Sequence, residues 1–464
     1  MGNLYILTAS LATAIFMSAL DTSIVNVVLP GLVTIFDTSF AAVQWVLLGY
    51  LLSLASTIVG VGSLGDLFGK KRIYLIGLGL FTIASGLCGL STSIYMLIFC
   101  RILQGFGAAV IMALTFAIAQ DAIPKDKITT TMTLITAMLS MGFAVGPTLG
   151  GFLIEWLGWE YIFFVNMPLG LFVMWGISRH LQPLIPTGTA SFDTAGMMLL
   201  GGTLMCYIAM MTVSQTYGFL SLPVLVFGLL FFSGLGGFLL LERRKSSPLI
   251  ELPMFRNKLL SSSLSTSVLV YSCMTCTQVL AAFFLAGVNG FSEFEIGLSL
   301  SVGPVVTMLL GFTAGFLCRF FSKRHLMLTG LIIMVFGSLA MTTLPPSDSL
   351  LPFCWRLACI NGGLALFQTP NNIMTMANAA AHQRGVVSAL LALSRTIGQI
   401  TGAAVMSSLF SLFLFYEGTT YSTASQDLLV SSYHQTFSIN TAYMLLTVLI
   451  VWWGIRENRK NSFL

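Results

Sequence analysis

The chain has 464 residues, of which 56% are hydrophobic and only 8% are charged. One aqueous domain cannot bury so much apolar surface, so the composition argues against a soluble enzyme and indicates that lipid is the solvent. The formal net charge of +5 follows the membrane topology described below, and we expect no binding to nucleic acid.

Apolar runs of about 20 residues recur along the whole chain, which is the length that crosses a hydrocarbon core about 30 Å thick. Asp21 and Asn26 lie where a signal-peptide cleavage site would fall, so we expect the first run to be retained as a span. The sequence predicts an all-α integral membrane protein with fourteen spans, at about 4–29, 40–64, 73–92, 94–120, 129–154, 160–178, 194–213, 219–241, 263–287, 296–318, 325–344, 350–377, 385–414 and 437–455.

These spans divide into three predicted parts. Residues 1–181 form an N-terminal bundle of six helices, and residues 182–258 form a linker with two extra transmembrane helices. Residues 259–464 form a second bundle of six helices with a short cytoplasmic tail.

Lys and Arg residues outside the spans all fall in alternate loops, beginning with Lys70, Lys71 and Arg72. Among charged residues, the opposite loops hold only Asp and Glu. By the positive-inside rule, both chain termini face the cytoplasm, which requires an even number of spans. We therefore expect a multi-pass protein of the cytoplasmic membrane, and we expect it to act as a monomer.

Features that would indicate a cofactor are missing or out of context. Residues 60–65 match G-x-G-x-x-G, but they follow a membrane span and no βαβ unit surrounds them, so we reject a dinucleotide site. No phosphate-binding loop of the G-x-x-x-x-G-K-[ST] type occurs, and the four histidines are scattered. Cys273 and Cys276 form a C-x-x-C inside an apolar run with no second pair nearby, so we expect buried thiols and no metal or redox cofactor.

The two predicted bundles carry traces of an internal repeat at an offset of about 253 to 255 residues. Residues 62–71 align with 315–324, and residues 101–107 align with 356–362. Two related six-helix halves are the plan that transporters use for alternating access around a site near the middle of the membrane.

Six short segments, in order and at the predicted span ends, resemble the major facilitator superfamily, in particular its fourteen-span branch of drug:proton antiporters. They are residues 20–30 (LDTSIVNVVLP), 62–72 (GSLGDLFGKKR), 101–107 (RILQGFG), 142–151 (GFAVGPTLGG), 159–170 (WEYIFFVNMPLG) and 192–196 (FDTAG). The resemblance implies a fold of two six-helix bundles plus two linker helices, and export of compounds in exchange for protons. The spans of the second bundle contain no Asp or Glu, so we do not expect a preference for dications.

Asp21 lies just past the middle of an otherwise apolar span, where an ionised carboxylate costs about 2.5 to 3.5 kcal/mol. Burial disfavours the charged form of a carboxyl group and a nearby arginine favours it, so a group poised between the two can load and release a proton. We predict that Asp21 is the proton-coupling carboxylate and that Arg101 is its partner. A permanently charged structural pair is the alternative.

Two further motifs have roles that the resemblance implies. Asp66 and Arg72 would form a latch between access states with Asp121, whereas a simple charge cluster that fixes topology is the alternative. The antiporter motif contains Gly142, Gly146, Pro147, Gly150 and Gly151, and its spacing by itself predicts only close helix packing and a kink.

Candidate substrate-binding residues are polar or aromatic and lie near the middle of predicted spans: Asn26, Trp45, Tyr50, Tyr271, Gln278, Arg356, Gln368, Asn371, Asn372 and Arg395. The arginines could bind an anionic group of the substrate, because a guanidinium group recognises carboxylates and phosphates, or could bind backbone carbonyls as structural residues. An aromatic side chain could equally serve in packing or as an interfacial anchor.

The sequence thus predicts a transporter without enzymatic activity: a proton-driven exporter of small hydrophobic or amphipathic compounds. A dedicated exporter of one metabolite or organic anion is the alternative in the same class. An integral-membrane enzyme acting on lipids predicts catalytic residues clustered at one interface, which the sequence lacks, and a receptor or scaffold leaves Asp21 and the repeat unexplained.

Overall fold

The computed structural model describes residues 2–182, 193–245, 248–347, 349–377, 384–421 and 423–461. Within these ranges the chain consists of helices, turns and short connections, and none of these residues forms a strand. The prediction of an all-α protein is therefore confirmed.

Two compact units make up the chain. The first unit comprises Met1–Ala209, Val226–Ile250 and Ser292–Gly297, and the second comprises Met210–Leu225, Glu251–Phe291 and Leu298–Leu464. The predicted domain boundaries at residues 181 and 258 stay predictions.

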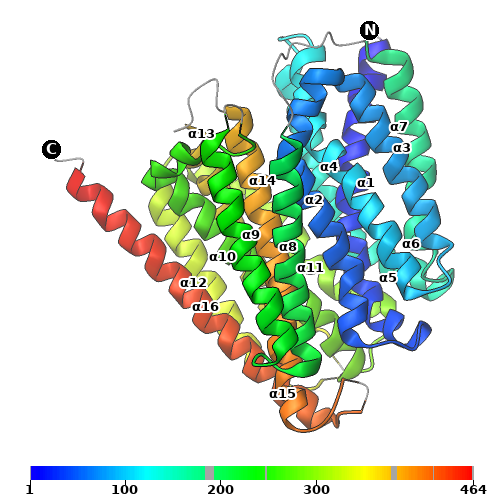
Figure 1. Ribbon diagram of the computed structural model, residues 1–464, viewed down its shortest axis with the longest axis vertical. Coiled ribbons are helices and arrows are strands. Elements are labelled where there is room, and N and C mark those ends of the chain that lie inside the picture. The colour runs from blue at the N-terminus through cyan, green and yellow to red at the C-terminus, as the bar shows by residue number, and fades with distance from the viewer. Residues whose placement is uncertain are drawn as a thin grey trace. The chain divides into compact units, whose positions relative to one another are not determined.

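The first unit is built on the helices at the start of the chain, several of which run side by side in Figure 1. Helix α1 packs along α5 and α7, α2 packs along α4, and α3 packs against α4 and α7. These helices are α1 (Gly2–Ile35), α2 (Phe40–Phe68), α3 (Lys70–Gly89), α4 (Ile94–Ala122), α5 (Ile128–Trp156), α6 (Tyr161–Phe164) and α7 (Asn166–His180).

Local sequence explains where the helices of this unit begin. The side chain of Ser39 accepts a hydrogen bond from the N–H of Ala42 at the start of α2, and Ser93 caps α4 in the same way. Gly69 separates α2 from α3 with a φ of +91°, a backbone conformation that other residues adopt only with strain. The charged segment 62–72 therefore contains a sharp turn between two spans.

The extra helix pair consists of α8 (Thr194–Tyr217) and α9 (Leu222–Arg244), followed by the short 3-10 helix η1 (Leu252–Arg256). Close approach of α8 and α9 depends on Gly234, where an added Cβ would lie 2.7 Å from Oγ1 of Thr203. The rings of Tyr207 and Phe231 also meet across the pair, with their centres 5.3 Å apart.

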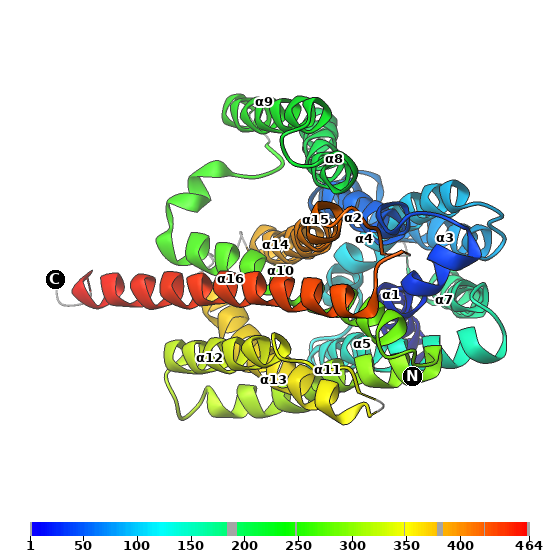
Figure 2. The same cartoon turned by 90° about the horizontal axis from the view of Figure 1, so that it is seen from below.

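The second unit contains the remaining long helices, seen from below in Figure 2. Helix α10 packs against α14 and α16, and α12 packs along α13. The helices are α10 (Lys258–Gly287), α11 (Glu293–Leu317), α12 (Lys323–Met341), α13 (Leu351–Ala377), α14 (Arg384–Thr401), α15 (Ser407–Tyr416) and α16 (Gln426–Asn461), with a π-helical turn η3 (Gly402–Met406) between α14 and α15.

Each predicted span coincides with helical structure, with ends that differ by up to six residues, and three spans show larger differences or irregularities. The span predicted at 160–178 is broken at Val165, because Pro168 has no N–H to donate to the last carbonyl of α6. The span predicted at 385–414 contains the π-turn. Helix α16 begins at Gln426, well before the predicted residue 437, and the polar residues of its first turns are the reason that the sequence did not reveal this start.

Thirteen helices in the described part of the chain are long and apolar enough to cross a membrane. Helix α13 is not among them, although its 27 residues are sufficient for a span. Polar and charged side chains lower its hydropathy, above all Arg356, Asn361, Gln368, Asn371 and Asn372. With α13 included, the predicted fourteen spans are accounted for.

Candidate functional site: a buried ion pair in the first unit

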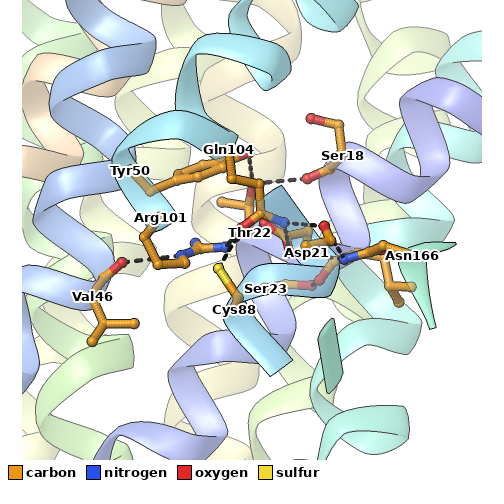
Figure 3. Close-up of polar contacts among 12 residues, drawn as sticks. Ser18, Asp21, Thr22, Ser23, Val46, Tyr50, Cys88, Arg101, Gln104 and Asn166 are labelled. Carbon is orange, nitrogen blue, oxygen red and sulfur yellow. Dashed lines mark hydrogen bonds and ion pairs between the residues drawn. The ribbon is translucent and has the colours of Figure 1, made fainter. Parts of the chain in front are cut away.

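A polar cluster lies inside the first unit, centred on Asp21 of α1 (Figure 3). The carboxylate atom Oδ2 accepts a hydrogen bond from Nη1 of Arg101, on α4, at 2.7 Å. The other oxygen, Oδ1, accepts hydrogen bonds from Nε2 of Gln104 at 2.7 Å and from Nδ2 of Asn166, on α7, at 3.0 Å. The two residues that the sequence paired are thus in direct contact, and helices α1, α4 and α7 converge on the carboxylate.

Arg101 is held on more than one side. Its Nε donates to the carbonyl oxygen of Val46 at 3.1 Å, and Nη1 also donates to Oε1 of Gln104 at 2.6 Å. The guanidinium carbon lies 4.2 Å from the centre of the Tyr50 ring, a cation–π contact. Its Nη2 is buried without a hydrogen-bond partner among the described residues. One edge of the guanidinium group is therefore unused in this arrangement.

The side chains of Asp21 and Arg101 are both 0% exposed. Removing one partner of such a buried pair leaves an uncompensated charge in a medium of low dielectric constant. Each charge of the pair therefore depends on the other, and Oδ1 of the carboxylate also accepts hydrogen bonds from Gln104 and Asn166 on the neighbouring helices.

The predicted antiporter motif on α5 packs directly against the segment of α1 that carries Asp21. A Cβ added at Gly142 would lie 2.6 Å from the carbonyl oxygen of Phe16, and one added at Gly146 would overlap Oγ of Ser23. The hydroxyl of Ser23 donates to the carbonyl oxygen of Gly142 at 3.2 Å. Helix α1 can approach α5 this closely only because these positions lack side chains, so the motif fixes the depth and rotation of the turn that holds Asp21.

The rest of the motif continues the same surface. Gly150 faces Ile24 of α1, and Pro147 lies within α5. Gly151 lies against the backbone of Glu293 and Phe294 at the start of α11, in the part of α11 that belongs to the first unit. Glycine at these positions thus serves close packing of backbones, as the spacing predicted.

The predicted latch residues lie at the α2–α3 turn and the end of α4. Lys70 Nζ lies 2.6 Å from Oδ2 of Asp121 and 3.3 Å from Oδ1 of Asp66, so it bridges the two acids. Arg72 is exposed and forms no ion pair with them. The acids that the resemblance selected are brought together, and the cation between them is Lys70.

The predicted substrate residues of the first unit have different surroundings. Tyr50 is fully buried, with its hydroxyl 3.1 Å from Oγ1 of Thr22 and its ring under Arg101, so it belongs to the ion-pair cluster. Asn26 and Trp45 are half-buried on α1 and α2. The side-chain oxygen of Asn26 has no hydrogen-bond partner among the described residues.

In the second unit, some of the predicted substrate residues have their hydrogen bonds satisfied by described residues of the protein and others do not. Asn371 is buried, accepting a hydrogen bond from Ser263 and donating one to Ser267, both on α10. Arg356 donates to backbone carbonyls. Arg395 donates to Asn372 at 2.8 Å, and its guanidinium carbon lies 5.7 Å from the centre of the Tyr271 ring. Gln278 and Gln368 are half-buried and form no hydrogen bond with described residues.

Comparison with known proteins places the fold in a family. The family model described as Major Facilitator Superfamily matches residues 11–403. The chain belongs to the major facilitator superfamily. It is therefore a multi-pass membrane protein of a transporter family.

Similar proteins carry names of different kinds. The chain is 28% identical to a protein called riboflavin transporter RibZ, from Clostridioides difficile, over 98% of this chain and 99% of that protein. It is 30% identical to multidrug resistance protein Stp, from Mycobacterium tuberculosis, over 86% of this chain and 74% of that protein.

A solved transporter structure has the same fold as the whole chain. A bacterial homolog of the human lysosomal transporter Spinster is similar with a TM-score of 0.70 and 17% identity, covering 98% of this chain and 97% of that one. At this identity the likeness shows the fold alone.

Three residues of this superfamily member gain roles that the sequence alone did not assign. Gln104 and Asn166 lie within segments that carried the resemblance, yet only the structure shows both amides donating to Asp21. Their signal was their polarity within apolar spans. Lys70 lies within the charged turn, but which of its three basic residues meets the acids depends on the rotation of α3.

Proposed function

We propose that this protein is a proton-coupled antiporter that exports small hydrophobic or amphipathic compounds across the cytoplasmic membrane by alternating access, as a monomer with both termini in the cytoplasm. The observation that supports it best is the buried ion pair between Asp21 of the first span and Arg101 of the fourth, because the turn that holds Asp21 packs on the predicted antiporter motif. Protons are the only coupling species required, and no bound cofactor is invoked.

The coupling step follows from the charges. While Asp21 is ionised, its three hydrogen bonds hold α1, α4 and α7 together, and its negative charge neutralises Arg101. Proton loading removes that negative charge, so the arrangement with an unpaired buried cation becomes unfavourable relative to any arrangement that hydrates Arg101 or gives it another partner. The proton therefore shifts the population of access states through differential stability.

The driving force suffices for efflux without ATP. One proton that crosses a potential of 100 mV supplies about 2.3 kcal/mol. At about 1.4 kcal/mol per tenfold change in concentration, this sustains a gradient of roughly fiftyfold.

Named relatives support export of this kind of compound. Among them are Stp and a tetracenomycin C resistance and export protein of Streptomyces glaucescens, which is 28% identical over 87% of this chain and 75% of that protein. The second candidate function is dedicated export of one metabolite, which is favoured by the likeness to the riboflavin transporter along 98% of the chain.

The test is proton flux in liposomes that contain the purified protein, driven by each member of a panel of amphipathic dyes. Wild-type protein should move protons when dye is transported, and Asp21→Asn should not. Asp126→Asn, which removes an exposed carboxylate from the loop after α4, is the matched control and should retain flux. Dye transport by Asp21→Asn with undiminished proton flux would contradict the proposal, whereas wild-type flux with a single compound would favour the dedicated exporter.

A further inference from the structure

Arg395 is a cation in the middle of a membrane helix of the second unit. It lies eleven residues after Arg384, the first residue of α14, which corresponds to about 16 Å along the helix axis and thus about half of a 30 Å hydrocarbon core. The predicted spans of this half contain no Asp or Glu that could neutralise it. A charge at this depth requires an interaction partner or water.

The contacts of Arg395 use only part of its hydrogen-bonding capacity. Its Nη2 donates to Oδ1 of Asn372, on α13, at 2.8 Å, and the guanidinium carbon lies 5.7 Å from the centre of the Tyr271 ring, on α10. Its remaining donors have no partner among the described residues. Arg101 differs because it has the carboxylate of Asp21 within 2.7 Å.

Arg356 shows how the same unit satisfies an arginine that serves structure. Its three nitrogen groups donate to the backbone carbonyls of Ala340, Pro352 and Thr343, and its guanidinium group stacks on Trp355 at 4.6 Å. Such an arginine serves to close the end of a helix, because each of its three nitrogens already donates to a backbone carbonyl. Arg356 and Arg395 therefore have different roles.

Further polar side chains lie four residues from Arg395 and from Asn372, and thus on the same faces of the two helices. Gln399 lies one turn further along α14, and Gln368 lies one turn before Asn372 on α13. Both are half-buried and neither forms a hydrogen bond with described residues. A stripe of unpaired amides and a guanidinium group is unfavourable against lipid, which indicates that it faces water or a ligand.

The backbone keeps Tyr271 in place beside this stripe. A Cβ added at Gly398 would lie 2.9 Å from Cβ of Tyr271 and 2.5 Å from the carbonyl oxygen of Val268. Helices α14 and α10 thus touch one turn beyond Arg395, which places the Tyr271 ring within reach of the guanidinium group.

We propose that Arg395, Tyr271 and Asn372 form a subsite for the oxyanion end of an aromatic substrate, with a carboxylate or phosphate on the free edge of the guanidinium group and the attached ring against Tyr271. An oxyanion accepts two parallel hydrogen bonds from such an edge, and the ring gains an aromatic contact. Asn372 orients the guanidinium group. This subsite rests on the proposed transport function and narrows its substrates to compounds that carry a negative charge.

The experiment compares two dyes that share the xanthene ring system and differ in charge: fluorescein in its anionic form and cationic rhodamine 6G. Binding of each dye to the purified full-length protein in detergent is followed by fluorescence anisotropy, without a proton gradient. Wild-type protein should bind fluorescein more tightly than rhodamine 6G. Arg395→Gln should weaken fluorescein binding at least tenfold, which corresponds to about 1.4 kcal/mol. Rhodamine binding should not weaken.

Two further variants sharpen the comparison. Asn372→Asp places a carboxylate of nearly the same shape beside Arg395, so it should weaken fluorescein binding and strengthen rhodamine binding without truncating the arginine. This variant carries the test if Arg395→Gln does not fold. Arg319→Gln removes an exposed arginine of the same unit and should bind both dyes as wild type does.

Unchanged fluorescein binding by Arg395→Gln and Asn372→Asp would overturn the proposal, as would equal weakening for both dyes. Because binding is measured without a gradient, the outcome is separate from that of the coupling experiment. Fluorescein binding that depends on Arg395 would stand even if proton flux did not depend on Asp21.

Discussion

The buried pair of Asp21 and Arg101 makes a quantitative prediction about stability. In Asp21→Asn, one side-chain oxygen can still accept from Gln104 and Asn166, but the new amide group would face Nη1 of Arg101, where the ion pair now measures 2.7 Å. Both partners are 0% exposed, so solvent does not screen the loss. Removing one partner of a buried pair costs about 3 to 5 kcal/mol, and we expect this loss in the free energy of unfolding.

A double-mutant cycle separates the stranded charge from simple loss of packing. Arg101→Gln in the Asp21→Asn background removes the cation that has lost its partner, so the double variant should be destabilised by less than the sum of the two single variants. Residues in such direct contact have coupling energies of about 0.5 to 3 kcal/mol, and we expect a value near the upper end. Arg72→Gln, which removes an exposed arginine of the same unit, should change stability by about 0.5 kcal/mol or less.

The assay is equilibrium unfolding of the purified protein in mixed micelles, followed by tryptophan fluorescence. Asp21→Asn protein as stable as the wild type would refute the reasoning, because it would mean that the pair adds nothing to the folded unit. Strict additivity in the cycle would also refute it, since the two side chains would then act independently.

Three other changes have expected outcomes. Gly146→Ala should reduce stability by about 1 to 3 kcal/mol, because its Cβ overlaps Oγ of Ser23, and thermal unfolding should show partial recovery when Ser23→Ala is added. Lys70→Met should cost less than about 1 kcal/mol, because its two ion pairs are partly exposed. The same variant should nevertheless slow dye transport if the cluster is a latch. Transport at the wild-type rate would indicate instead that the charge cluster only fixes topology. Burial alone would raise the pKa of Asp193, but hydrogen bonds from Lys245 and the backbone hold that pKa below its ordinary value of 3.8. The ionised carboxylate of Asp193 therefore stabilises the folded protein. This stabilisation is complete above the pKa of Asp193 in the unfolded chain and is lost as pH falls through its pKa in the folded protein. The difference in thermal stability between wild type and Asp193→Asn should accordingly shrink below about pH 4.

The sequence by itself determined the number of membrane spans, their approximate ends and the charged residues that lie within them. Long apolar runs fixed the number and the approximate ends of the spans, because crossing a bilayer requires a minimum length and excludes charge. For the same reason Asp21, Arg101 and Arg395 were conspicuous, and a buried acid and base in one half of the chain could be paired from their positions within apolar spans. The start of the last span was placed too late, because the first turns of α16 are polar, and the break in the helix before Pro168 was not foreseen although the span itself was.

Only the tertiary structure decided which side chains meet across helices. Lys70 rather than Arg72 bridges the acids at the α2–α3 turn, and Asn166 reaches Asp21 from α7. Arg356 donates its hydrogen bonds to backbone carbonyls, whereas Arg395 donates to the side chain of Asn372. Sequence periodicity gives the relative angle of residues on one helix, but the rotation of each helix about its axis is set by packing, here by glycines such as Gly142 against α1. A rotation of one residue, about 100°, changes every partner, and that information is not contained in any single span.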